Sequence, residues 1–215
     1  LCCVDKANVL ETSRLWRETV QSMEKNYPNI EVSYEFVDAV AMRLVQWPNS
    51  YDVLITSNLF GDILTDEASV ISGSMGLMPS ASVGSKNALY EPIHGSYPEA
   101  AGKNIANPIA SILSLSMMLD HSFNLRKESE IINKAVEESL KNKYVTPDLS
   151  SGKNSFSTDQ VGDYIVDFIE KNFKKQLLFY SMNHPTKYLF NYLSEEIIKI
   201  LNLKNTIDVE LDPLD

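Results

Sequence analysis

The sequence has little cysteine. Its only two cysteines in 215 residues are adjacent, at Cys2 and Cys3. Neighbouring cysteines make poor disulfide partners, and no other cysteine is present to complete a metal-binding pair. We therefore expect two buried thiols in a reducing compartment. Because no signal-peptide pattern is visible either, the sequence predicts a cytoplasmic protein.

Long hydrophobic runs and excess positive charge are also missing. The longest apolar-rich stretch, Pro108 to Leu119, carries three serines and is too short to span a bilayer. Acidic residues outnumber basic ones by 29 to 19, and a formal charge of −10 argues against broad binding to nucleic acids or anionic membranes. A composition of 44% hydrophobic and 22% charged residues fits a soluble globular protein.

What is present, in the first 72 residues, is an alternation of strand-like and helix-like segments. The segments are a strand at Leu1–Val4, a helix at Asn8–Val20, a strand at Ile30–Val37, a helix at Asp38–Val45, a strand at Tyr51–Thr56 and a helix after it. Alternation of this kind favours an α/β architecture.

The remainder of the chain divides into three parts. Residues 73–107 hold five glycines and few regular runs, which predicts a long irregular connection. Helices are expected from Asn107-Pro108 to Leu119, over Ser129–Lys141 and over Val161–Phe173, with Pro108 at the first helical position. Residues 174–215 are expected to form an appended tail with a helical apolar stripe from Tyr188 to Leu203. Since the chain opens on Leu1 inside a strand, we expect it to be the later part of a longer protein.

An acidic pair stands out in the helix that follows the third predicted strand. Asp62 and Asp66 are four residues apart, and like charges at this spacing destabilise a helix by a few tenths of a kcal/mol. Open α/β sheets bind ligands beyond the carboxyl ends of their strands, and Asp38 follows another of these strands. Three carboxylates there would suit Mg²⁺ or Mn²⁺. The alternative is a solvated helix face, with Asp38 as an N-cap.

Two further places could carry chemistry. Lys6 lies between a strand and a helix, either as an exposed lysine paired with Asp5 or as a group that moves a proton beside a metal. The stretch Glu91-Pro-Ile-His-Gly-Ser96 is not a GxGxxG fingerprint, and its His94 could simply complete a turn. It could also form a nucleotide site, with His94 packed on adenine, Gly95 allowing close backbone approach and Glu99 accepting a ribose hydroxyl.

Five stretches of the sequence, taken together and in order, carry a resemblance. They are VDKANVLETSRLWR, VDAVAMRLV, SNLFGDILTDEAS, GLMPSAS and EPIHGSYPEAAGKNIANP. Over residues 1 to about 173 the chain resembles the isocitrate/isopropylmalate dehydrogenase family, and VDKANVLETSRLW points to its isopropylmalate branch. The resemblance implies the C-terminal part of that α/β fold, without the family's N-terminal part.

The resemblance also implies an activity, a set of site residues and an assembly. The activity is NAD-dependent oxidative decarboxylation of (2R,3S)-3-isopropylmalate to 4-methyl-2-oxopentanoate, a step of leucine biosynthesis. The residues are Lys6 and Asp38 for catalysis, Asp38, Asp62 and Asp66 for Mg²⁺ or Mn²⁺, and His94, Gly95, Glu99 and Asn107 for NAD. The family forms homodimers with shared active sites, and the helices Ile63–Val70 and Pro108–Leu119 are candidates for the interface or for an intrachain core.

Two departures from the family pattern bear on function. Glu99 stands where the family more often has aspartate, so the charge is kept, and a carboxylate there favours NAD over NADP because it would repel a 2′-phosphate. The family's substrate-binding arginines and catalytic tyrosine belong to the absent part, so the piece alone is expected to be inactive. The alternatives are a sister enzyme acting on tartrate, D-malate or homoisocitrate, and a non-catalytic fragment.

Overall fold

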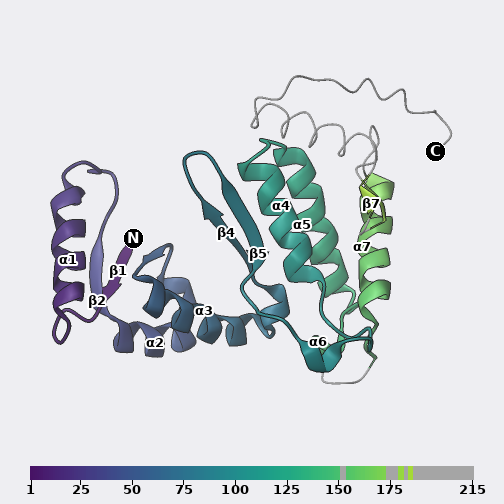
Figure 1. Ribbon diagram of the computed structural model, residues 1–215, viewed down its shortest axis with the longest axis horizontal. Coiled ribbons are helices and arrows are strands. Elements are labelled where there is room, and N and C mark those ends of the chain that lie inside the picture. The colour runs from purple at the N-terminus through teal and green to yellow at the C-terminus, as the bar shows by residue number, and fades with distance from the viewer. Residues whose placement is uncertain (151–153, 173–178, 182–183, 186–215) are drawn as a thin grey trace.

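The computed structural model describes residues 1–150, 154–172, 179–181 and 184–185. Strands and helices alternate from the first residues onward, which confirms the predicted α/β class (Figure 1). In chain order the elements are β1 (Cys2–Asp5), α1 (Glu11–Glu24), β2 (Ser33–Phe36), α2 (Val37–Gln46), η1 (Pro48–Ser50), β3 (Leu54–Ile55), α3 (Asn58–Ser72), η2 (Met75–Leu77), β4 (Pro79–Val83), β5 (Ala88–Pro92), η3 (Pro98–Ala100), α4 (Ile109–His121), α5 (Arg126–Lys141), α6 (Pro147–Ser150), α7 (Thr158–Asn172), β6 (Phe179–Ser181) and β7 (His184–Pro185).

The first three strands form a parallel sheet in the order β2-β1-β3. Cys2 and Val4 of β1 pack with Val40 and Leu44 of α2 and with α3, and α1 also lies against β1. Successive side chains of a strand point to opposite faces, so Cys3 faces the side of the sheet away from α2 and α3. The register pairs Asp5 with Phe36, so β1 and β2 end at the same edge. Because all three strands are parallel, the segments that follow them emerge together at this edge.

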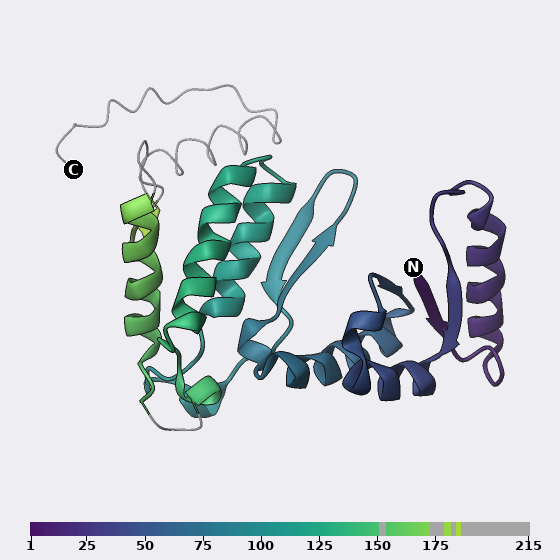
Figure 2. The same ribbon diagram turned by 180° about the vertical axis from the view of Figure 1, so that it is seen from behind.

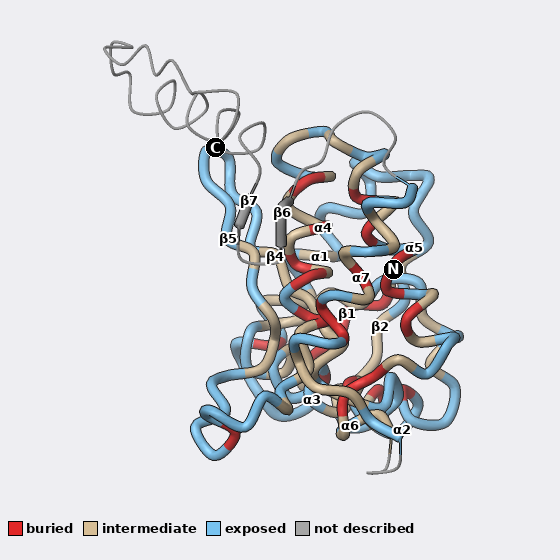
Figure 3. Tube along the Cα trace, turned by 90° about the vertical axis from the view of Figure 1, so that its right-hand side faces the viewer, coloured by how far each residue is buried: buried red, intermediate tan, exposed pale blue. Residues whose placement is uncertain are grey.

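A second apolar cluster lies among the later helices. Residues of α4, α5 and α7 form it, with Ile109, Leu119, Ile132, Val161 and Ile165 at most 2% exposed. The antiparallel hairpin β4–β5 packs against α4. The sheet and the helical cluster occupy opposite ends of the long axis, with α3 and the hairpin between them (Figures 1 and 2). Buried stretches gather in β1 and in α4 and α5, as Figure 3 shows.

Several predicted boundaries need correction. The prediction of a long irregular connection over 73–107 was wrong, because this segment contains the hairpin β4–β5. The first helix begins at Glu11 rather than Asn8, since the Lys6 carbonyl oxygen accepts the backbone N–H groups of Val9 and Leu10 in a tight turn. Helix α4 begins at Ile109, which makes Pro108 its N-cap rather than its first helical residue.

Burial decides between two readings of the apolar helices. The apolar residues of α4 are buried or half-buried, and none of them is exposed. Helix α3 instead exposes Leu59 (66%), Ile63 (55%) and Val70 (78%). Of the two candidate interface helices, α4 therefore serves the intrachain core, and only α3 presents large apolar side chains to its surroundings.

The cysteines are free and buried, as the sequence predicts. Burial raises the pKa of both thiols, that of Cys3 to about 11, so neither is a reactive thiolate near neutral pH. Among the described residues, no helix combines the length and apolar character that crossing a membrane requires. The helix predicted at Tyr188–Leu203 lies outside the described residues, and the boundary at residue 173 stays a prediction.

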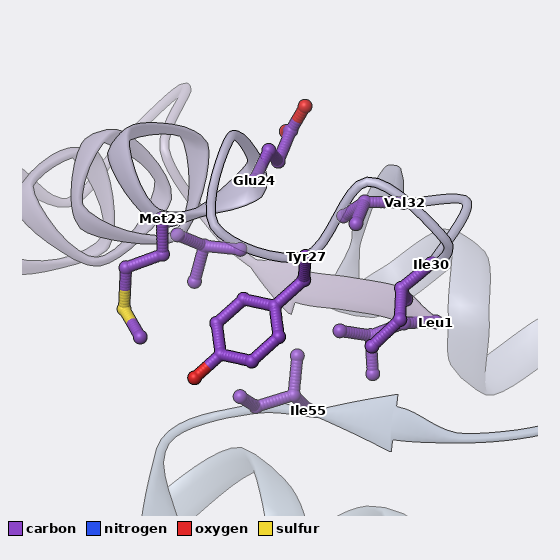
Figure 4. Close-up of a pocket in the computed structure, with 8 residues that line it drawn as sticks. Leu1, Met23, Glu24, Tyr27, Ile30, Val32 and Ile55 are labelled. Atoms are coloured by element: carbon purple, nitrogen blue, oxygen red, sulfur yellow. The ribbon is translucent and has the colours of Figure 1, made fainter.

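An apolar pocket of about 230 Å³ opens where the last turn of α1 meets the sheet (Figure 4). Its lining includes Leu1, Met23, Tyr27, Ile30 and Ile55, and none of the predicted site residues is among its walls. Tyr27 and Ile30 are about half exposed. The pocket therefore lies between the end of α1, the turn that follows it, and Ile55 of β3.

Candidate functional site

Lys6 and Asp38 meet at the carboxyl edge of the parallel sheet. Lys6 directly follows β1, and Asp38 lies in the first turn of α2, directly after β2. Lys6 Nζ is 2.7 Å from Asp38 Oδ1, and the side chains are 24% and 67% exposed. The hydrogen bond from Lys6 is the main reason why the pKa of Asp38 lies below its usual value. The sequence therefore identified two residues that the fold brings together.

Asp5 pairs with Arg17 and not with Lys6, the partner that the sequence suggested. Its carboxylate accepts hydrogen bonds from Arg17 Nε at 2.7 Å and from a second guanidinium nitrogen of Arg17 at 3.0 Å. Asp5 is 1% exposed, so the pair is largely removed from water. The alternative in which Lys6 pairs with Asp5 is therefore wrong.

Asp62 and Asp66 project from α3, which begins three residues after β3. Both side chains are exposed and lie one helical turn apart. Asn58 Nδ2 donates to Asp62 Oδ2 at 3.1 Å. Two accessible carboxylates on one face supply the hard oxygen ligands that Mg²⁺ or Mn²⁺ takes.

The chain by itself does not assemble the three predicted metal ligands. Within the described residues, no group of three or more His, Cys, Asp or Glu side chains could hold a metal ion. Asp38 is instead engaged with Lys6. One chain thus offers Asp62 and Asp66 as a pair, apart from Asp38.

The predicted nucleotide loop connects β5 to α4. His94 Nδ1 lies 3.0 Å from the carbonyl oxygen of Gly95. A Cβ built on Gly95 would meet no atom within 4 Å, so contacts within the chain do not require glycine there. Glu99 is exposed in the short helix η3. The loop therefore presents an imidazole, an open stretch of backbone and a carboxylate to the surroundings.

Asn107, at the end of this loop, is held by the chain itself. Its Oδ1 accepts the backbone N–H of Ile109 at 3.0 Å, and its Nδ2 donates to Asp148 Oδ2 at 3.0 Å. Asp148 also accepts hydrogen bonds from Ser74 and from Thr146. Partial burial raises the pKa of Asp148. The three side-chain hydrogen bonds together lower this pKa by more than burial raises it, so the net shift is downward.

Sequence reasoning missed Arg17 and Asp148, and it considered the wrong partner for Asp5. An aspartate that ends a strand otherwise made of Cys and Val was a usable signal, because a buried carboxylate needs a partner. Asp148 follows Thr146-Pro147, a turn-like stretch, but nothing local indicates that Ser74 and Asn107 converge on it.

Comparison with known proteins gives consistent matches over most of the chain. The model of the family described as isocitrate/isopropylmalate dehydrogenase matches residues 1–165. A curated protein named 3-isopropylmalate dehydrogenase from Aquifex aeolicus is 52% identical over 172 residues, which are 80% of this chain and 47% of that protein. The protein of the same name from Wolinella succinogenes is 52% identical over 173 residues, 80% of this chain and 48% of its own length. The chain thus spans about half the length of the curated relatives it matches.

Solved structures agree with the sequence matches. An isocitrate dehydrogenase from Methylococcus capsulatus superposes with a TM-score of 0.76 at 41% identity, covering 78% of this chain and 50% of that one. A beta-decarboxylating dehydrogenase from Thermococcus kodakarensis superposes with a TM-score of 0.71 at 38% identity, covering 81% and 50%.

Proposed function

Since the chain belongs to the isocitrate/isopropylmalate dehydrogenase family, we propose that it supplies the C-terminal part of an NAD-dependent 3-isopropylmalate dehydrogenase of leucine biosynthesis. The reaction oxidises (2R,3S)-3-isopropylmalate and releases CO₂, giving 4-methyl-2-oxopentanoate. The observation that carries the proposal is the 2.7 Å contact of Lys6 with Asp38, at the sheet edge from which α3 emerges. The names of the curated relatives at 52% identity support the choice of substrate.

Lys6 is the proton acceptor in this proposal. In its neutral form the amine would take the proton of the substrate hydroxyl, directly or through one water, and NAD bound at the site would supply the hydride acceptor. Asp38 holds the amine in place, and its negative charge stabilises the ammonium that forms when the proton is taken. With its carboxylate at 67% exposure, Asp38 is also accessible from outside the chain.

The proposed metal is Mg²⁺ or Mn²⁺, held by Asp62 and Asp66 of one chain and by Asp38 of the partner subunit. A divalent ion bound there would stabilise negative charge as it develops on the substrate oxygen. The exposed Leu59, Ile63 and Val70 of α3 suit burial against a second copy, and this supports a homodimer with shared sites.

NAD is assigned to the loop that carries His94, Gly95, Glu99 and Asn107. The open backbone at Gly95 allows a ligand to approach closely, and the exposed Glu99 can accept hydrogen bonds from ribose hydroxyls. The buried free thiols of Cys2 and Cys3 fit a reducing compartment, so we place the enzyme in the cytoplasm.

A sister reaction is the second candidate, because structures named isocitrate dehydrogenase and beta-decarboxylating dehydrogenase share this fold at 41% and 38% identity. A non-catalytic role is the third. Against it stands the presence of Lys6 and of the aspartates at 38, 62 and 66.

The test is an assay of the full-length protein, meaning these residues together with the rest of the family fold. NADH formation is measured with 3-isopropylmalate and with D-malate at saturating Mg²⁺, and the product is identified by mass spectrometry. We expect 4-methyl-2-oxopentanoate and a kcat/KM on the order of 100-fold higher for isopropylmalate, since D-malate lacks the three apolar carbons of the isopropyl group and each buried methylene contributes about 0.8 kcal/mol. Preference for D-malate would establish the sister reaction, and no turnover of either would favour the non-catalytic role.

A further inference from the structure

Arg17 reaches from α1 to the turn that carries Lys6. Its guanidinium grips both carboxylate oxygens of Asp5, at 2.7 Å and 3.0 Å. The Oδ1 atom of Asp5 also accepts the backbone N–H of Ala7 at 2.8 Å. The hydrogen bonds that the Asp5 carboxylate accepts thus fix the residues on both sides of Lys6.

The same guanidinium is held by aromatic rings of β2. Its central carbon lies 5.4 Å from the centroid of Tyr34 and 5.1 Å from that of Phe36. Lys6 Nζ lies 5.7 Å from the centroid of the Phe36 ring as well. Phe36 pairs with Asp5 across the sheet and stands two residues before Asp38. One ring therefore contacts the cations of Arg17 and Lys6, next to the residue that Lys6 binds.

Arginine is the side chain that this arrangement requires. A guanidinium matches a carboxylate with two parallel hydrogen bonds and packs flat on an aromatic ring, whereas a lysine ammonium does neither equally well. Removing Arg17 would leave the carboxylate of Asp5, which is 1% exposed, without its counter-charge. Asp5 would then turn toward water or toward another cation, and Lys6 is the nearest one along the chain.

We propose that Arg17 is a positioning residue for the reaction: acting through Asp5 and Phe36, it sets the turn that directs Lys6 Nζ onto Asp38. This inference rests on the proposed function, in which Lys6 accepts the proton. It adds a residue outside the reacting groups on which the geometry of that proton transfer depends.

The test compares Arg17→Met, Arg17→Lys and Lys6→Met in the full-length protein, with Arg126→Met as the matched control. Arg126 is an arginine of α5 whose side chain is 80% exposed and whose partner is Glu130. We expect Arg17→Met to lower kcat by about 10- to 100-fold, because small misplacements of a catalytic group cost up to this much. The KM values for NAD and substrate should stay within about twofold, and Arg17→Lys should recover part of kcat.

A purely structural role would give a different pattern. It would lower the yield or melting temperature of Arg17→Met and leave the kcat of the folded enzyme unchanged, and this result would overturn the proposal. If Arg17→Met does not fold, Asp5→Asn removes the charge with little change in shape, and a kcat equal to wild type in this variant would overturn it too. If Lys6→Met itself keeps full activity, the proposed function fails, and the inference about Arg17 fails with it for a distinguishable reason.

Discussion

Lys6 Nζ and Asp38 Oδ1 are 2.7 Å apart, although a helix and a strand separate the two residues in the sequence. They meet because β1 and β2 are parallel neighbours in register and both residues follow a carboxyl end. Water screens a pair in which Asp38 is 67% exposed, so this pair contributes little to folding stability. Its position at a sheet edge, rather than its strength, makes it informative about function.

Replacing Asp62 or Asp66 by asparagine should weaken Mg²⁺ binding without lowering the stability of the metal-free protein. In Asp62→Asn and Asp66→Asn, relief of the repulsion along α3 should leave metal-free stability unchanged or raised by a few tenths of a kcal/mol. Affinity for Mg²⁺ should fall by at least about 10-fold. Losing a residue that only hydrogen-bonds to a metal ligand already costs about 10- to 100-fold in affinity, and losing a ligand itself should cost no less. Thermal unfolding with and without Mg²⁺ measures both effects. Asp163→Asn, an exposed aspartate of α7, is the control, and equal metal affinity in all variants would contradict the assignment.

Substitution by alanine should lower stability at Gly76, whereas at Gly95 it should raise the KM for NAD and leave stability unchanged. A Cβ at Gly76 would lie 2.6 Å from Asn107 Cβ, so Gly76→Ala must displace Asn107 and should cost about 1–3 kcal/mol in unfolding free energy. A Cβ at Gly95 would meet no atom within 4 Å, so Gly95→Ala should change stability by less than about 0.5 kcal/mol. Its KM for NAD should nevertheless rise by roughly 5-fold, about 1 kcal/mol of lost binding, if a ligand approaches that backbone. An unchanged KM would remove Gly95 from the cofactor site.

Glu99 should decide between the two nicotinamide cofactors. Glu99→Arg loses hydrogen bonds to the ribose hydroxyls and gains attraction for a 2′-phosphate. The ratio of kcat/KM for NADP to that for NAD should therefore rise by at least about 10-fold, corresponding to one charge-assisted hydrogen bond. Glu137→Arg, an exposed residue of α5, serves as the control. A ratio that stays at the wild-type value would show that Glu99 does not contact the ribose.

Asp148 should make stability depend on acid pH. Because its pKa is lowered in the folded state, its ionised form stabilises the fold above the unfolded pKa near 3.9, and this contribution is lost as pH falls through the folded pKa. Asp148→Asn should therefore be less stable than wild type by about a few tenths of a kcal/mol at pH 7, since water screens this exposed carboxylate, and the difference should shrink below about pH 4. Urea unfolding from pH 3 to pH 7 measures this. A difference that does not vary with pH would contradict the role of the charge.

The sequence was sufficient for elements with a clear local pattern. The strand at the start, the helix after Phe36 and the aspartate helix were predicted near their true positions. The hairpin β4–β5 was missed because Pro79-Ser-Ala-Ser-Val83 lacks the alternation of large apolar and polar residues that predicts a strand. It forms through pairing with β5 and packing on α4, and neither partner is visible in its own sequence.

Site residues divide in the same way. The acidic pair of α3 and the residues of the predicted nucleotide loop are recognisable by type and spacing. The partners of charged groups are not: Lys6 binds Asp38 rather than its neighbour Asp5, because the parallel register decides which residues share the sheet edge. Asp148 likewise gathers donors from Ser74, Asn107 and Thr146, which only the tertiary fold brings together.

In the proposed homodimer, Lys6 of one subunit and Asp62 of the other serve the same active site. The most direct measurement is the activity of a purified hybrid dimer that contains one Lys6→Met chain and one Asp62→Asn chain, isolated through two different tags. With shared sites, one of the two sites is intact in the hybrid, so we expect about half of the wild-type kcat per dimer, while both parent homodimers are inactive. A hybrid dimer as inactive as its parents would show that Lys6 and Asp62 do not meet across the subunit interface.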